Sequence, residues 1–456
     1  MRHAKLRGLA LVLATPLLLP FSVHAEVPPV LAIKDARVIT VSGPILEKGT
    51  VVIRNGLIEA VGANITIPPD AWVLEGAGLN VYPGLMDSLS TWGITEASAL
   101  APSGDQQRGR SGGPPTPQNA APPVVSRGPE DRPGTTSWLK AQDLVKPSDR
   151  RLEAARNAGF TTAVTFPTRG IFAGQGAVIS LAGANSGNMV IAPSVGQYIS
   201  LTPTGFTGYP GSLMGVFAYI RQVYSDAEYY KTAKARYAAK PSVARPEYDR
   251  ALEGVLETPR VLLPAARTVD VDRMLSFASD IKVQPVLYGL HRGYTRADVI
   301  AKSGVPVLVS LKWPERPRDT DPESIESLQV LKLRDEAAST PKALAAAKAK
   351  FAFYSDGIER PADILRAVKK AIDAGLSQDD AVRAMTLSGA EIFGVSDRLG
   401  SIDKGKIANL TITKGELFRD GTKVEYVIID GVKILPTPEA PPPAGNNAAS
   451  PTEVIQ

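Results

Sequence analysis

The segment that decides the fold is Val81-Tyr82-Pro83-Gly84-Leu85-Met86-Asp87-Ser88, near the start of a chain of 456 residues. Before it, residues 31–81 contain short β-rich runs separated by turns. After it, runs typical of strands and helices alternate as far as residue 394, and this repetition favours a parallel sheet, open or closed into a barrel. The segment therefore marks the boundary between two architectures.

The β-rich pattern returns only near the carboxyl-terminal end of the chain. Asn55-Gly56 separates two runs of the first part, and Asp430-Gly431 separates two runs of the last part. Both dipeptides favour type I′ hairpin turns, because both central positions of that turn need positive φ. We therefore expect a composite β-sandwich domain formed by residues 26–82 and 395–436.

The middle of the chain contains typical strand–helix repeats. Residues 150–158 read as a helix and residues 161–166 as the strand that follows it. Ser377 is a helix N-cap, and the helix that it begins is expected to continue through Phe393. The glycine-rich residues 170–176 lack the Lys-Ser/Thr ending of a phosphate-binding loop, so we expect only a bend there.

Two segments fall outside this scheme. Residues 101–136 contain 8 Pro and 6 Gly. Because the segment has too few large apolar side chains to order itself, we expect it to be a mobile insertion that could close over a barrel mouth. Residues 437–456 are expected to form a disordered, Pro-rich tail.

The first 25 residues resemble a secretory signal peptide, with a basic start, an apolar stretch and a small-residue cleavage site before Glu26. The apolar stretch is too short to be a good membrane span, so we expect a periplasmic or secreted protein without a span after cleavage. Cleavage removes Arg2, Lys5 and Arg7, which lowers the formal charge from +5 to +2. The mature chain therefore gives no reason to expect nucleic-acid binding.

The residue composition restricts the possible chemistry. The chain has no Cys, which excludes disulfides and thiolate ligands, and only 3 His. His3 and His24 lie in the signal segment, so His291 is the one histidine expected in the mature protein. A His-rich catalytic metal site cannot be assembled from it alone.

The Pro-Gly segment resembles the entry to the first barrel strand in the amidohydrolase superfamily. A second motif, Leu399-Gly400-Ser401-Ile402-Asp403-Lys404-Gly405-Lys406-Ile407-Ala408-Asn409-Leu410, resembles the return of that family into its β-domain. The resemblance is especially close to the imidazolonepropionase-like branch and to related cyclic-amidase and dipeptidase branches. It implies a (β/α)₈ barrel, here residues 83–394, with its chemistry at the carboxyl-terminal ends of the strands.

The resemblance also implies a reaction, in which a metal-bound hydroxide attacks an amide or cyclic C–N bond. The family's His-x-His pair falls on Leu89 and Thr91, and a later His falls on Thr268. Only His291 and Asp356 match the remaining positions, and in the family that Asp is both a ligand and the general base. They are the candidate catalytic residues.

The candidate metal ligands are His291, Asp356, Asp87 and Asp270, with Glu96 as a further oxygen donor. This set favours a single oxygen-preferring divalent ion over the family's binuclear zinc. A purely structural interpretation also stays open: His291 hydrogen-bonded at a strand end, and Asp356 capping the turn that follows it.

Three functions remain open at this stage. The chain could be a degenerate subunit or binding protein that lost the metal centre, either as a homo-oligomer or paired with an intact relative. It could be a divergent mononuclear C–N hydrolase that uses Asp356 and His291. It could also be an envelope scaffold that binds a carbohydrate or peptide. All three have a small-molecule ligand or substrate at the barrel mouth.

Overall fold

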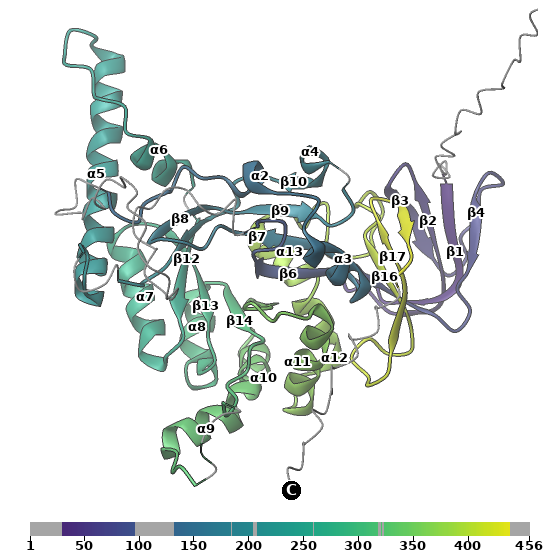
Figure 1. Cartoon of the computed structure of the whole chain (residues 1–456). Helices are drawn as coiled ribbons and strands as arrows, with labels where there is room; N and C mark the ends of the chain where they lie inside the picture. The colour runs from purple at the N-terminus through teal and green to yellow at the C-terminus, as the bar shows by residue number, and fades with distance from the viewer. Residues whose placement is uncertain are drawn as a thin grey trace, which may run out of the picture.

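The computed structural model describes residues 30–95, 132–183, 185–203, 208–258, 260–317, 321 and 323–437 (Figure 1). The predicted signal peptide, residues 101–131 of the predicted insertion, residues 438–456 of the predicted tail and Glu96 lie outside these ranges. Within them, no helix has the length and apolar character needed to cross a membrane.

Both ends of the described chain contribute to one eight-stranded sheet, on the right of Figure 1. Its strands are β1 (Val30–Val38), β2 (Leu46–Arg54), β3 (Leu57–Gly62), β4 (Trp72–Glu75), β5 (Asn80–Pro83), β16 (Leu410–Lys414), β17 (Lys423–Ile429) and β18 (Val432–Ile434). The order is β18-β17-β16-β5-β1-β2-β3, with β4 paired to β1. Because β16 lies antiparallel to β5, hydrogen bonds join the two ends into one sheet.

The two predicted hairpin turns are confirmed. Asn55 and Gly56 have φ values of 50° and 80°, and Asp430 and Gly431 have values of 53° and 80°. Both central residues of each turn thus adopt the positive φ that a type I′ turn requires. The Asp430 carboxylate also accepts a hydrogen bond from Ser180 Oγ at 2.7 Å, which ties the second turn to the middle part of the chain.

The rest of the molecule is a mixed α/β barrel-like domain with two sheets. Its strands are β6 (Leu85–Ser90), β7 (Phe160–Thr165), β8 (Phe172–Gln175), β9 (Ala177–Ser180), β10 (Val190–Ala192), β11 (Gln197–Ile199), β12 (Arg260–Ala265), β13 (Gln284–Gly289), β14 (Val307–Ser310) and β15 (Phe351–Tyr354). One sheet has the order β10-β9-β7-β6 and the other β15-β14-β13-β12-β11-β8. β6 is parallel to β7, and each strand from β11 to β15 is parallel to the next.

The segment from β8 to β9 links the two sheets and runs antiparallel to its neighbours β11 and β7. The expectation of a simple bend at residues 170–176 is therefore wrong for its second half, which is strand β8. Burial explains the difference: Phe172 is fully buried and packs edge-on against Tyr219. Gly176 lies between the two strands, where a Cβ atom would come within 2.2 Å of the Phe166 ring.

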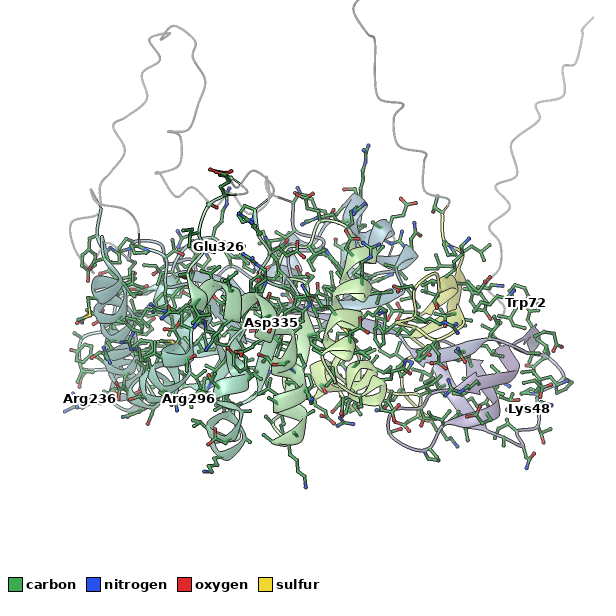
Figure 2. The ribbon with its side chains drawn as sticks, turned by 90° about the horizontal axis from the view of Figure 1, so that it is seen from below. Lys48, Trp72, Arg236, Arg296, Glu326 and Asp335 are labelled. Atoms are coloured by element: carbon green, nitrogen blue, oxygen red, sulfur yellow. The ribbon has the colours of Figure 1, made fainter. Side chains whose placement is uncertain are left out.

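The helices lie mainly outside the sheets (Figure 1). They are α2 (Ala141–Leu144), α3 (Arg150–Asn157), α4 (Ser186–Met189), α5 (Leu213–Ala239), α6 (Arg250–Glu257), α7 (Thr268–Asp280), α8 (Ala297–Ser303), α9 (Leu328–Glu336), α10 (Thr340–Ala346), α11 (Pro361–Asp373), α12 (Gln378–Ala384) and α13 (Leu387–Phe393), with short 3₁₀ turns η2 (Gly293–Thr295) and η3 (Ala337–Ser339). In Figure 2, Arg236 near the end of α5 and Trp72 of the β-domain mark opposite ends of the molecule.

The helix expected to run from Ser377 through Phe393 is in fact two helices. Ser377 caps α12 as predicted, its Oγ accepting a hydrogen bond from the Asp380 backbone N–H at 3.0 Å. The chain then leaves helical geometry at Thr386, where φ is −136° and ψ is −91°. This break lets the Met385 carbonyl accept a hydrogen bond from the Met86 N–H at 2.8 Å, so the helix pair is bonded to β6.

The Pro-Gly segment connects the two domains between β5 and β6. A Cβ atom on Gly84 would lie 2.0 Å from Thr161 Oγ1, so the close approach of β6 to β7 requires a glycine there. The Gly84 N–H donates to the Asn409 carbonyl at 2.7 Å, and the Asn409 side chain contacts Thr162 and Asp430. The two motifs on which the family resemblance rests are thus in direct contact.

Candidate functional site

The positions that the resemblance assigns to metal-binding histidines contain side chains engaged in other contacts. Leu89 is 6% exposed and packs in the barrel interior. The Thr91 hydroxyl accepts a hydrogen bond from Arg151 Nη1 at 2.9 Å. Thr268 Oγ1 lies 3.2 Å from Thr295 Oγ1, as a hydroxyl–hydroxyl hydrogen bond. None of the three can supply an imidazole.

Arg151 holds the chain that follows β6. Its Nη2 donates to the backbone carbonyls of Thr91 and Ile94 at 2.9 and 2.7 Å, and to the Asp149 carboxylate at 2.7 Å. Asp149 also caps α3 by accepting from the Arg151 N–H, and it accepts from the Gly93 N–H at 2.9 Å. A guanidinium and its carboxylate partner therefore stand beside one of the family's metal-ligand positions.

Asp87 lies on the seam between β6 and β15, which belong to different hydrogen-bonded sheets. It is 1% exposed, and its Oδ1 accepts hydrogen bonds from the Ser355 N–H at 3.0 Å and the Leu89 N–H at 3.4 Å. Its Oδ2 is buried and has no hydrogen-bond partner among the described residues. Burial raises the pKa of Asp87 to about 7; the hydrogen bonds lower the pKa and the nearby Asp356 raises it further.

His291 and Asp356, the candidate catalytic pair, lie near each other at the barrel mouth. Burial lowers the pKa of His291, whereas the Asp356 carboxylate and a hydrogen bond with the Ser310 backbone raise it. His291 Nε2 is buried and has no hydrogen-bond partner among the described residues. Ser310 Oγ donates to Asp356 Oδ2 at 2.7 Å, so Ser310 contacts both candidates.

Asp356 also has an unusual backbone conformation. Its φ is 51°, and Gly357 after it has a φ of 72°, so the chain turns sharply as it leaves β15. The Asp356 side chain is exposed, unlike that of Asp87. An exposed carboxylate on a tight turn at the end of a barrel strand is placed to contact a ligand.

Three tyrosines surround this group. The rings of Tyr198 and Tyr288 stack with centroids 5.2 Å apart, and a side-chain hydrogen bond joins them. The Tyr354 ring packs edge-on against Tyr288 at 6.5 Å. Burial raises the pKa of all three hydroxyls, and Asp356 raises them further, so these phenols stay protonated at neutral pH.

Asp270, the fourth candidate ligand, is held within its own helix. It lies in the first turn of α7, where its Oδ2 accepts from the Arg267 N–H at 3.0 Å and its Oδ1 accepts from Arg267 Nη2 at 2.9 Å. Arg267 therefore engages both oxygens of the carboxylate, through its backbone N–H and its guanidinium.

The described residues do not fit the family's metal centre. Across the described ranges, no group of three or more His, Cys, Asp or Glu side chains could hold a metal ion. His291 Nε2 and Asp87 Oδ2 are orphaned polar atoms, but a catalytic metal usually has three protein ligands.

Sequence reasoning missed Ser310 and the tyrosine cluster, defined here as Tyr198, Tyr288 and Tyr354. Each lies at the carboxyl-terminal end of a strand, which is where a barrel places its chemistry. Ser310 could have been found from the sequence, because it is a polar residue that ends an apolar run, Val307-Leu308-Val309-Ser310. Contact between residues 198, 288 and 354 could not be read without the fold.

Comparison with known proteins agrees with this architecture. The amidohydrolase family matches residues 286–434. The fold is similar to an amidohydrolase from Thermotoga maritima MSB8, with a TM-score of 0.71 and 23% identity over 89% of this chain and 100% of that one. It is also similar to a prolidase complexed with N-methylphosphonate-L-proline, with a TM-score of 0.55 and 17% identity over 90% of this chain and 100% of that one. No curated protein matches the chain.

The two kinds of comparison cover different parts of the chain. The family match spans β13 to β18, including His291, Asp356 and the second motif. The structural similarity extends over the β-domain and the remaining barrel strands as well. Taken together, residues 286–434 match the amidohydrolase family, and the fold over about nine-tenths of the chain is similar to solved amidohydrolase and prolidase structures.

Proposed function

We propose that the chain is an exported, ligand-binding member of the superfamily whose barrel mouth binds a small molecule without hydrolysing it. The observation that carries the proposal is the replacement of the His-x-His pair by Leu89 and Thr91, with the Arg151 guanidinium hydrogen-bonded to Thr91. Neither side chain can replace an imidazole as a metal ligand, and the Thr91 hydroxyl is already engaged by Arg151. Export rests on the signal-like residues 1–25, and the protein would then be periplasmic or secreted.

The mouth offers a ligand two kinds of contact. The tyrosine cluster supplies aromatic surface and protonated hydroxyls, and Asp356 supplies an exposed carboxylate. Small-molecule sites commonly combine aromatic walls with a few polar groups. Since the similar prolidase structure contains N-methylphosphonate-L-proline, we expect a ligand of about the size of a dipeptide or cyclic amide. Pairing with a second copy or with an intact relative would be compatible with this role.

A second candidate is a mononuclear C–N hydrolase. The observation in its favour is the pair of orphaned atoms, Asp87 Oδ2 and His291 Nε2. Buried polar atoms without partners usually contact a water or an ion. A single ion bound to these two atoms would need Asp356 as its third protein ligand.

Elemental analysis of the mature protein distinguishes the two candidates. The protein is purified without a His-tag, offered Zn²⁺, Mn²⁺ and Mg²⁺, and desalted. We expect no stoichiometric ion, together with saturable binding of dipeptides or cyclic amides that survives a chelator and gives no product. Asp356→Asn should weaken that binding about tenfold, as expected for the loss of a charged hydrogen-bonding group.

The matched control is Asp335→Asn, since Asp335 is an exposed carboxylate on α9 (Figure 2) that forms no ion pair among the described residues. It should leave ligand affinity unchanged. A stoichiometric ion that is lost in Asp356→Asn, accompanied by hydrolysis in the wild type, would refute the binding proposal and establish the hydrolase. Tight binding of oligosaccharides but not of amides would refute the proposed ligand class.

A further inference from the structure

A large cavity opens at the end of the barrel opposite the candidate site. Its volume is about 760 Å³, which is within the range of small-molecule sites. It is lined by the first residues of three strands, Arg260 of β12, Gln284 of β13 and Phe351 of β15, together with residues from α12 and α13. Because Tyr288 lies near the carboxyl-terminal end of β13, at the mouth, the cavity and the mouth lie at opposite ends of the same strand.

The cavity wall carries an excess of positive charge. Its cationic side chains are Arg260, Lys348, Lys350 and Arg383, and its anionic side chains are Asp380 and Glu391. Arg383 and Glu391 neutralise each other through an ion pair of 2.7 Å. The Asp380 carboxylate accepts a hydrogen bond from Ser377 Oγ at 2.6 Å, within the first turn of α12.

Arg260 is the central cation of this wall. Its Nη1 donates to the backbone carbonyls of Val195 and Phe393 at 2.9 and 3.4 Å, and these contacts fix the guanidinium in place. Within the described part of the chain it forms no ion pair with a carboxylate. Burial lowers its pKa, with no nearby acid to oppose the effect. A partly buried guanidinium without a counter-charge is costly, unless an anion joins it.

Apolar side chains form another part of the lining, which also includes the polar residues Gln284, Ser388 and Ser396. Pro285 and Pro306 lie at the edge of the cavity in half-buried positions, and Val286 and Ile392 are buried beneath it. Neither proline can donate a backbone hydrogen bond, and the two rings offer a ligand apolar surface. The cavity lining therefore combines positively charged side chains with apolar ones.

We infer that this cavity is a second binding site, for a small organic anion whose carboxylate or phosphate meets Arg260 and whose apolar part packs against Pro285 and Pro306. Lys348 and Lys350 are exposed on the same wall, and they form no ion pair among the described residues. They are placed to attract the anion and to contact its outer oxygens. This site is independent of the barrel mouth and of its proposed ligand.

Calorimetric titration of the full chain at constant ionic strength tests the inference. The probes are benzoate, inorganic phosphate and benzamide, the last being a neutral molecule of nearly the same shape as benzoate. We expect saturable binding of benzoate and at least tenfold weaker binding of benzamide. Preference for phosphate over benzoate would assign the site to phosphate-bearing ligands.

Variants locate the binding. Arg260→Gln should weaken benzoate binding at least tenfold, because a hydrogen-bonded charge is lost. Since Arg260 also holds two backbone carbonyls, the double variant Lys348→Gln/Lys350→Gln provides a second test on exposed residues, with an expected loss of about threefold to tenfold. Lys146→Gln is the matched control, because Lys146 is exposed and its backbone bonds to Gly93, beyond the other end of β6.

Three results would overturn the inference. The first is that neither benzoate nor inorganic phosphate binds saturably. The second is that benzoate and benzamide bind with equal affinity. The third is benzoate affinity that stays unchanged in both the Arg260 variant and the double lysine variant. Since none of these residues lies at the mouth, Asp356→Asn should leave benzoate binding unchanged.

Discussion

Replacing Asp87 by asparagine should change how the stability of the protein depends on pH. The folded protein raises the pKa of this carboxyl from its ordinary 3.8 to about 7, chiefly by burial. Between these two values the folded state binds the proton and the unfolded state does not, so the free energy of unfolding falls as pH rises. At about 1.4 kcal/mol per pH unit, the gap corresponds to about 4 kcal/mol.

An asparagine side chain at this position would keep an oxygen able to accept the Ser355 and Leu89 N–H bonds, and it carries no charge at any pH. The free energy of unfolding of the variant should therefore not fall in this way as pH rises. We expect the stability of Asp87→Asn relative to the wild type to rise by about 4 kcal/mol between about pH 4 and about pH 8.

Urea unfolding at a series of pH values measures this difference directly. Taking the difference between variant and wild type cancels the titration of all other groups that the substitution leaves alone. Asp335→Asn, on the exposed surface of α9, is the control and should give a difference that does not vary with pH. A flat difference for Asp87→Asn as well would refute the argument that burial dominates the environment of this carboxyl.

Two further substitutions test the contacts that hold the site in place. Gly84→Ala should destabilise the protein by about 1–3 kcal/mol through overpacking, since the new Cβ would lie 2.0 Å from Thr161 Oγ1. Adding Thr161→Ala to the same chain should restore part of the lost free energy of unfolding, as measured by urea denaturation. If it restores none, the steric explanation is contradicted. Arg151→Met should lower the free energy of unfolding by about 2–3 kcal/mol, because Thr91 and Asp149 lose their charged donor. Arg150→Met, at the exposed neighbouring position, should stay within about 0.5 kcal/mol by the same assay, and an equal effect of both would contradict a specific role for Arg151.

Features fixed by local chemistry could be predicted from the sequence. Asn55-Gly56 and Asp430-Gly431 specify their turns because few other residues tolerate positive φ at both positions. The Ser377 cap was likewise visible, because a cap depends only on residues three positions apart. A similar local rule could have shown that the carboxylate of Asp270, in the first turn of its helix, accepts a hydrogen bond from the Arg267 backbone N–H and is therefore engaged.

Features that depend on distant parts of the chain could not be predicted. The break at Thr386 adjoins the hydrogen bond from the Met86 N–H of β6 to the Met385 carbonyl, and the sequence of residues 377–393 does not specify this distant contact. The antiparallel direction of β8 likewise depends on which strands lie on either side of it. The tyrosine cluster joins strands that are far apart in the sequence, so only the folded arrangement reveals it.

The pairing of β5 with β16 has a consequence for how the molecule is made. Asn80 Nδ2 donates to the Gly415 carbonyl at 2.7 Å across 335 positions of sequence. A ribosome therefore releases β1 to β5 long before the strand that covers the open edge of β5 has been synthesised. An uncovered strand edge invites pairing with other chains. We therefore expect chains that end before β16 to aggregate, because the edge of β5 that β16 covers would stay open.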